Sequence, residues 1–336
     1  MNQETARRVA HEWLVSDPPQ VVELRSGRRI GAGLVATVQR RTARLRRLDD
    51  HLGGGDLLDT VAGELAATVS LAREASYTEA VGRTLLAAIG DLAQVAGWVA
   101  SDAGAHDVAA RFYLGGVHAA HAGGDPALAA NLLSLLAYQT ASVGDPRDAV
   151  LLARSAHRGA RQRATAGARV LVAERVAWAH ARAGQRARCD RVLGEVDELF
   201  EGVRPDDEPD WAYWLTRDEI DIMAGRCYAE LERPIRAVPL LESALGRYQN
   251  DSAREASLYA TWLADSYITA REIEQAAEVA SRALELSTTV SSTRSRDRVA
   301  AVRTRLGPYR DSPAVRSFEE RYRTMAGARN DERTRP

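Results

Sequence analysis

Three large aromatic side chains recur at a fixed spacing in this chain of 336 residues. Trp98, Tyr138 and Trp178 lie 40 residues apart. Aromatic rings offer a large contact area at little cost in rotamer freedom, and polar groups beside them fix the orientation of a ligand. The spacing predicts a ladder of rings in a ligand-binding groove. Its polar members would lie one or two helical turns before a ring, or at the equivalent place in a later repeat: Gln94, Asn131, Ser134, Glu174 and Arg226.

Each ring is followed, six residues later, by a glycine. Gly104, Gly144 and Gly184 are each flanked by helical patterns of about 15 residues, which predicts turns between antiparallel helices. A phase error of one residue rotates a helix by about 100° and would move the rings from a groove into the core between repeats. Packing between repeats is therefore the alternative role for the ladder.

Two later segments, 224–245 and 263–284, carry a related pattern. Each has a small residue and an aromatic one turn apart, then small residues along a second helix. The matching residues are Gly225, Tyr228, Ala237 and Ala244 in one unit, and Ala264, Tyr267, Ala276 and Ala283 in the other. The pattern resembles the tetratricopeptide repeat, with units nearer 40 residues than the usual 34 or so.

This repeat predicts an all-α fold, namely a tetratricopeptide-like α-solenoid that forms a right-handed superhelix of helix pairs. The repeat array is expected over residues 57–290. Residues 1–56 are expected to form a linker with a helix, a short β-hairpin over Val21–Gly31 and an Arg-rich helix. Residues 291–326 are predicted to form capping helices, since a solenoid must cover its last apolar face, and 327–336 a disordered tail.

Several longer strings resemble one group of proteins: Leu92–Gly104, Asn131–Gln139, Gly144–Val150 and Leu306–Arg316 in the expected array, and Trp13–Val15, Val21–Gly31 and Leu48–Gly54 before it. They match the C-terminal repeat region of actinobacterial, XRE-type transcriptional regulators and the linker before it, in which a helix-turn-helix domain precedes the array. The expected helix-turn-helix would lie before residue 1, so we expect no direct nucleic-acid binding by this chain.

Composition excludes several kinds of chemistry. All 45 basic residues are arginines, which excludes a P-loop lysine and a Schiff-base lysine. The two cysteines, Cys189 and Cys227, are too few for a disulfide framework or a cysteine-based zinc site. With no recognisable catalytic motif, we expect neither an enzyme nor a cofactor.

Charge and hydropathy bear on the partners and the compartment that we expect for the chain. Residues 51–293 hold 23 arginines against 34 acidic residues, which is unlike a nucleic-acid-binding surface. No window of the sequence approaches 18 uninterrupted apolar residues, and residues 1–20 lack the apolar core of a signal peptide. We therefore expect a cytoplasmic protein that does not engage a membrane.

Three weaker features each allow two interpretations. His118 and His121, near Asp125, could bind a metal with a further ligand, or simply lie at a helix C-terminus. The run Arg40–Arg47 is a solvated helix face, or contacts a phosphate backbone or an acidic partner. The segment Asp206–Asp210, with its neighbouring tryptophans, is solvated or binds arginines of another subunit.

These observations predict a regulatory sensor that binds a small molecule, peptide or partner protein in its groove and is linked to transcriptional regulation. The alternative is a passive scaffold for protein–protein interaction without a small ligand. A homodimer is an open alternative for the oligomeric state.

Overall fold

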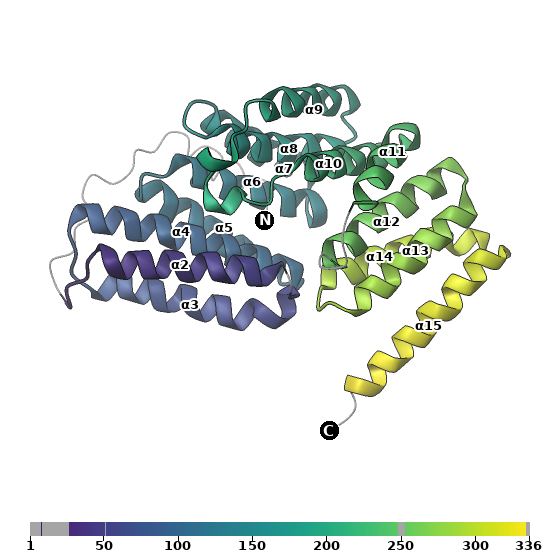
Figure 1. The fold of residues 1–336 in the computed structure, drawn as a ribbon, viewed down its shortest axis with the longest axis horizontal. Coiled ribbons are helices and arrows are strands. Elements are labelled where there is room, and N and C mark those ends of the chain that lie inside the picture. Colours follow the sequence, from purple (N-terminus) through teal and green to yellow (C-terminus); the bar gives the residue numbers. More distant parts are fainter. Residues whose placement is uncertain (1–7, 9–26, 51, 248–252, 334–336) are drawn as a thin grey trace. The chain divides into compact units, whose positions relative to one another are not determined.

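The computed structural model describes residues 8, 27–50, 52–247 and 253–333 (Figure 1). Secondary structure within these residues is helical apart from isolated β-bridge positions, among them a bridge between Arg29 and Ser76. The predicted all-α class is therefore confirmed. The predicted hairpin over Val21–Gly31 lies mostly outside the described residues, and its described end makes this bridge to Ser76.

The chain divides into two compact units, Met1–Thr216 and Arg217–Pro336. Unit 1 contains α2 (Ala32–Asp49), α3 (Gly54–Glu74), α4 (Glu79–Asp102), α5 (His106–Ala122), α6 (Pro126–Val143), α7 (Pro146–Ala160), α8 (Ala166–Arg182), α9 (Arg186–Phe200) and the short 3₁₀ turns η1 (Pro205–Asp207) and η2 (Asp210–Ala212). Unit 2 contains α10 (Arg217–Glu230), α11 (Pro234–Leu245), α12 (Ala253–Ala270), α13 (Ile273–Thr288), α14 (Thr293–Leu306), η4 (Gly307–Tyr309) and α15 (Pro313–Arg333).

In unit 1 the helices from α3 onward pack against the next helix along the chain, and alternate helices also touch. Helices α2, α4, α6 and α8, labelled in Figure 1, form a row in which each contacts the next. Helix α6 has neighbours on several sides and is buried almost all round, which suits its lack of any charged residue. Helix α7, outside the row, buries one side and exposes arginines on the other.

The predicted glycine turns separate the helices of unit 1. Gly104 and Gly184 follow α4 and α8 with φ angles of +84° and +69°, a left-handed conformation that favours glycine. Gly144 ends α6 in an extended conformation instead. Asp125 and Asp145 are the N-cap residues of α6 and α7, where their carboxylates accept hydrogen bonds from the amides of Leu128 and Arg147.

Glycine also permits close packing of helices. A Cβ placed on Gly97 of α4 would lie 2.4 Å from Cε1 of Tyr113 on α5. In unit 2, a Cβ on Gly225 of α10 would lie 2.7 Å from Cγ of Leu241 on α11. Both positions therefore require a residue without a side chain.

Unit 2 repeats this arrangement on a smaller scale. Helix α12 packs against α10, α11, α13 and α14, and α15 packs against α13. Helix α15 continues to Arg333, beyond Ala326, the predicted end of the capping helices. Phe318 of α15 and Leu306 of α14 are fully buried.

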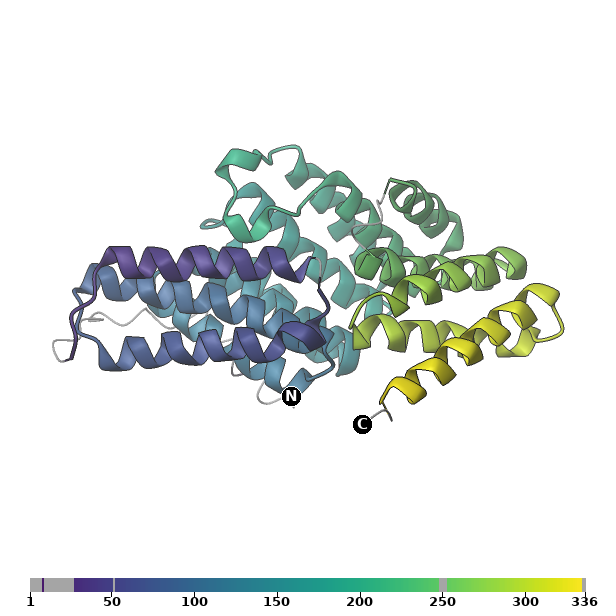
Figure 2. The same ribbon diagram turned by 60° about the horizontal axis from the view of Figure 1, so that its bottom comes forward.

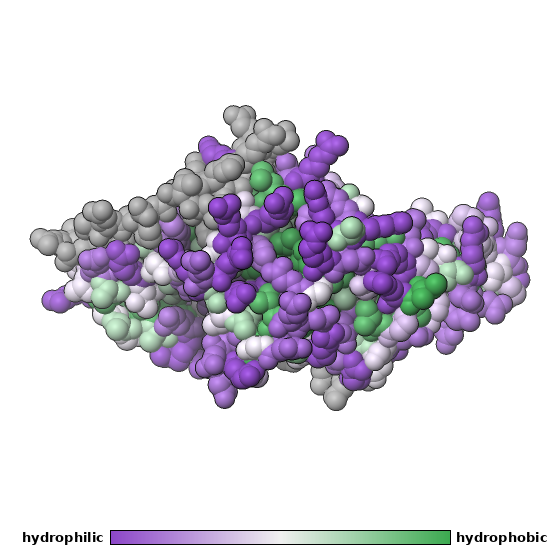
Figure 3. Space-filling model, turned by 90° about the horizontal axis from the view of Figure 1, so that it is seen from above, coloured by the Kyte–Doolittle hydropathy of each residue, from purple (hydrophilic) through white to green (hydrophobic). Residues whose placement is uncertain are grey.

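One described helix, α4, is long and apolar enough to cross a membrane by length and composition. In the structure 61% of its most apolar window is buried inside the protein. The face drawn in Figure 3 is largely hydrophilic, with apolar side chains only in small patches. Burial within the unit thus accounts for the apolar composition of α4.

Candidate functional site

The three rings spaced by 40 residues lie side by side in unit 1. Trp98 on α4 stacks on Tyr138 of α6, with ring centroids 6.2 Å apart and planes 27° apart. Tyr138 in turn lies 6.1 Å from Trp178 of α8, at 39°. These separations are typical of favourable aromatic pairs. The contacts between α4 and α6 and between α6 and α8 bring the rings together.

The ladder is more accessible at α4 than at α8. Tyr138 is 7% exposed and Trp178 only 2%, whereas Trp98 and Gln94 are partly exposed. Much of the ladder therefore lies between packed helices, as expected for rings that also join repeats. A molecule from solvent would reach it most readily beside Trp98 and Gln94.

The polar residues predicted beside the rings have different surroundings. Asn131 and Ser134 are buried on α6, and the Ser134 hydroxyl donates to the carbonyl of Asn131 at 2.7 Å. Glu174 is 2% exposed and pairs with Nη1 of Arg175 at 3.4 Å. Gln94 has a buried Oε1 that accepts no hydrogen bond from the described part of the chain.

Arg175 belongs to the ladder although sequence reasoning did not select it. Its guanidinium lies 5.0 Å from the Tyr138 ring centroid and 5.9 Å from that of Trp214. It is 5% exposed, and its Nε donates no hydrogen bond within the described residues. A buried cation between two rings gains from cation–π attraction. The sequence signal was an arginine inside the apolar run of α8.

Arg226, predicted as a further member of the groove, lies in unit 2. It is buried on α10, with its guanidinium 5.5 Å from the Trp262 ring centroid and 5.9 Å from that of Tyr259. Arg298 of α14 also lies over the Trp262 ring, 3.6 Å from its centroid, and pairs with Asp265 at 2.5 Å. Arg226 thus belongs to a second cluster of rings and arginines within its own unit.

Two segments that sequence analysis treated separately meet in unit 1. We call residues 203–216, which join α9 to α10, the strap. Asp210 of the strap accepts hydrogen bonds from Arg46 at 2.6 Å and from Arg47 at 2.9 Å, both on the Arg-rich helix α2. The acidic segment therefore pairs with arginines of its own chain, an outcome that neither interpretation had included.

Further contacts hold the strap on both α2 and α8. Tyr213 donates to the carboxylate of Asp50, and the Arg47 guanidinium lies 4.7 Å from the Tyr213 ring centroid. On α8, Glu208 accepts hydrogen bonds from the amides of Gly167 at 2.8 Å and Ala168 at 3.2 Å. A carboxylate at a helix N-terminus satisfies amides that have no partner within the helix.

The pKa values of two carboxyl groups at the strap contact shift in opposite directions. The hydrogen bond from Arg47 lowers the pKa of Asp210, and the nearby charges of Arg46 and Arg47 act in the same direction. Burial raises the pKa of Asp91 on α4, although Arg46 donates to it at 2.5 Å and opposes that shift. Burial and the hydrogen bond to Asp50 raise the pKa of Tyr213.

The suggested metal ligands do not form a cluster. Among the described residues no group of three His, Cys, Asp or Glu side chains is arranged to hold a metal ion. Asp125, which could have joined His118 and His121, caps the N-terminus of α6.

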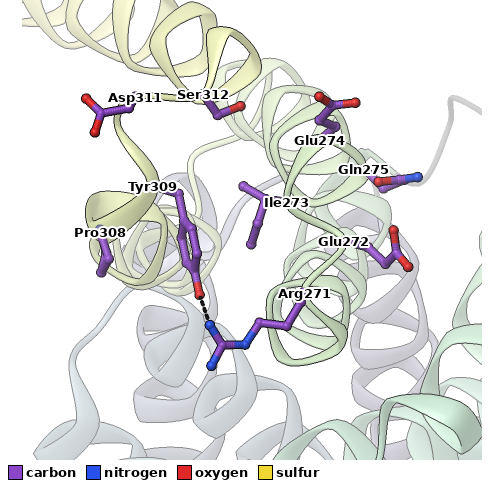
Figure 4. Close-up of a pocket in the computed structure, with 9 residues that line it drawn as sticks. All are labelled: Arg271, Glu272, Ile273, Glu274, Gln275, Pro308, Tyr309, Asp311 and Ser312. Carbon is purple, nitrogen blue, oxygen red and sulfur yellow. Dashed lines mark hydrogen bonds between the residues drawn. The ribbon is translucent and has the colours of Figure 1, made fainter.

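A pocket of about 560 Å³ lies in unit 2, between the start of α13 and the turn η4 (Figure 4). Tyr309 and Ile273 face each other across it, and Arg271 donates to the Tyr309 hydroxyl at 3.1 Å. The predicted site residues do not line this pocket. Its charged lining residues are Arg271, Glu272, Glu274 and Asp311, and the uncharged ones are Ile273, Gln275, Pro308, Tyr309 and Ser312.

Comparison with known proteins adds no assignment to this geometry. No protein-family model matches the chain, and no curated protein matches it.

Proposed function

We propose that this chain is a regulatory receptor built on a tetratricopeptide-like array. In this proposal a small molecule or peptide binds at the aromatic ladder and acts on transcription through an attached or partner DNA-binding domain. The likeness of the repeat strings to regulator arrays motivates the link to transcription. Successive helix pairs, and the row of alternate helices in unit 1, are what such an array requires.

One observation carries the binding site. Trp98, Tyr138 and Trp178 form a continuous ladder, and Gln94 Oε1 beside it is buried without a hydrogen bond from the described residues. An unsatisfied buried polar atom costs about 1–3 kcal/mol, and a ligand donor would remove that cost. The binding surface in this proposal is the α4 end of the ladder, where Trp98 and Gln94 are partly exposed.

The test is native mass spectrometry of the purified full-length chain, followed by a thermal-shift screen of any released molecule. We expect a co-purifying small molecule or peptide that raises the melting temperature when added back. Trp98→Ala and Gln94→Leu should lose it, whereas Tyr309→Ala, a ring removed from unit 2, should retain it. Equal retention by all three variants would reject the ladder as the binding site.

A passive scaffold is the second candidate. The low exposure of Tyr138 and Trp178 favours it, because rings enclosed between repeats serve packing first. In that case the same preparation should hold a partner protein and no small molecule, and no compound in the screen should shift the melting temperature.

A further inference from the structure

The row of helices in unit 1 is closed by the strap. Helices α2, α4, α6 and α8 contact one another in sequence, and η2 of the strap contacts both α2 and α8, the two ends of the row. Figure 2 shows the strap beside α2. We propose that the strap is a releasable latch: it stays attached to α8 and opens and closes the row by breaking and remaking its contacts with α2.

The two sides of the strap are held differently. On the α8 side, Glu208 caps the helix N-terminus, accepting hydrogen bonds from the amides of Gly167 and Ala168, and its side chain is only partly exposed. On the α2 side, the side chains of Asp210 and Arg47 are 50% and 49% exposed. Ion pairs this exposed are weak and are screened by salt. The α2 contact is therefore the side that releases first.

Release leaves no buried charge without a partner. Arg46 is the one largely buried member of the contact, with a side chain 9% exposed, and it also pairs with Asp91 on α4 at 2.5 Å. Removing a partner from a buried ion pair is costly because the remaining charge is uncompensated. Here Asp91 continues to compensate Arg46, while Asp210 and Arg47 return to water. Asp91 thus lowers the free-energy cost of releasing the strap from α2.

The latch is connected to the aromatic ladder through one side chain. Arg175 lies between the ring of Tyr138 in the ladder and the ring of Trp214 in the strap. A ligand that takes Arg175 away from Trp214 would loosen the strap, and an open strap would free Arg175 for a ligand. This coupling rests on the proposed function, whereas the latch itself does not.

The test measures hydrogen exchange of the strap amides, 203–216, in the full-length chain at low and high salt. Asp210→Asn should speed their exchange roughly three- to tenfold at low salt, the range expected for loss of a small network of exposed ion pairs. In the unmodified protein 0.5 M sodium chloride should reproduce most of that increase, and it should add little in the variant. Asp206→Asn is the matched control, because it removes the same charge from an exposed position of the same segment.

A cross-link provides a second measurement. Asp50→Cys with Tyr213→Cys, joined by a short bis-maleimide, should suppress strap exchange at both salt concentrations, and the native Cys189 and Cys227 are buried and so do not compete. The latch proposal is wrong if the strap amides exchange no faster in Asp210→Asn than in Asp206→Asn. It is also wrong if salt speeds their exchange equally in these two variants. A working latch in a protein that binds no ligand would reject the receptor function alone.

Discussion

Arg46 and Asp210, separated by 164 positions in the sequence, are joined by a hydrogen bond of 2.6 Å between Nη1 and Oδ2. The same guanidinium donates through Nη2 to Asp91 on α4. One arginine of α2 therefore connects three segments of unit 1: α2 itself, α4 and the strap. Its neighbour Arg47 reaches Asp210 from a much more exposed position.

Arg46→Ala should destabilise unit 1 far more than Arg47→Ala. Loss of Arg46 leaves the Asp91 carboxylate, whose side chain is 22% exposed, without its cation, which should cost about 3 kcal/mol. Loss of Arg47 removes an exposed partner and should cost less than about 1 kcal/mol. Urea denaturation of both variants followed by circular dichroism measures the difference, and equal midpoints would contradict the role assigned to Arg46.

The contribution of Asp210 to stability should depend on pH in the acid range. The pKa of Asp210 is lowered in the folded protein, so its ionised form stabilises the fold. That stabilisation is fully present above the unfolded-state pKa of about 3.9 and is lost as pH falls through the lower folded-state pKa. Unmodified protein should exceed Asp210→Asn in urea midpoint at pH 6, and the gap should narrow below about pH 4. A constant gap would show that the carboxylate charge is not what matters.

The ladder should be energetically unequal along its length. Trp178→Ala empties a site that is 2% exposed and should cost about 3–5 kcal/mol, whereas Trp98→Ala, at a partly exposed site, should cost clearly less. Thermal and urea unfolding of the two variants measure this difference. If both variants lose 3–5 kcal/mol, Trp98 is as much a core residue as Trp178, and the accessible end of the ladder does not exist.

Two helical glycines should respond in opposite directions to alanine. At Gly97 the new methyl would lie 2.4 Å from the Tyr113 ring and should cost about 1–3 kcal/mol despite the better helix propensity of alanine. Gly63 of α3 is exposed, with no neighbouring atom within 4 Å of the added methyl, so alanine should stabilise by about 0.5–1 kcal/mol. Melting temperatures of the pair test the predicted close packing of α4 on α5.

The regular part of unit 1 could be predicted from sequence because a repeated sequence pattern places equivalent residues in the same kind of contact several times. The 40-residue period located the turns at Gly104, Gly144 and Gly184 and anticipated that Trp98, Tyr138 and Trp178 would meet. Burial was harder to predict, since a period fixes which residues are equivalent and not how deeply each one lies.

The strap could not be predicted in the same way. Its contacts with α2 occur once in the chain and join residues more than 160 positions apart, so no periodicity announces them. Arg175 was missed for a related reason: it is one position after Glu174, about 100° around the helix, and its partner Trp214 comes from the strap. Each charged segment looked solvated because its complement was so distant.

The order of synthesis gives the Arg46 contact a further meaning. A chain emerging from the ribosome can pair α2 with α4 once residue 91 has appeared, so Arg46 has a carboxylate early. Its other partner, the carboxylate of Asp210, is synthesised only after α2 to α9 have all been made. Closure by residue 210 is consequently a late, long-range step in folding, and a nascent chain stalled before it would carry α2 without its final attachment.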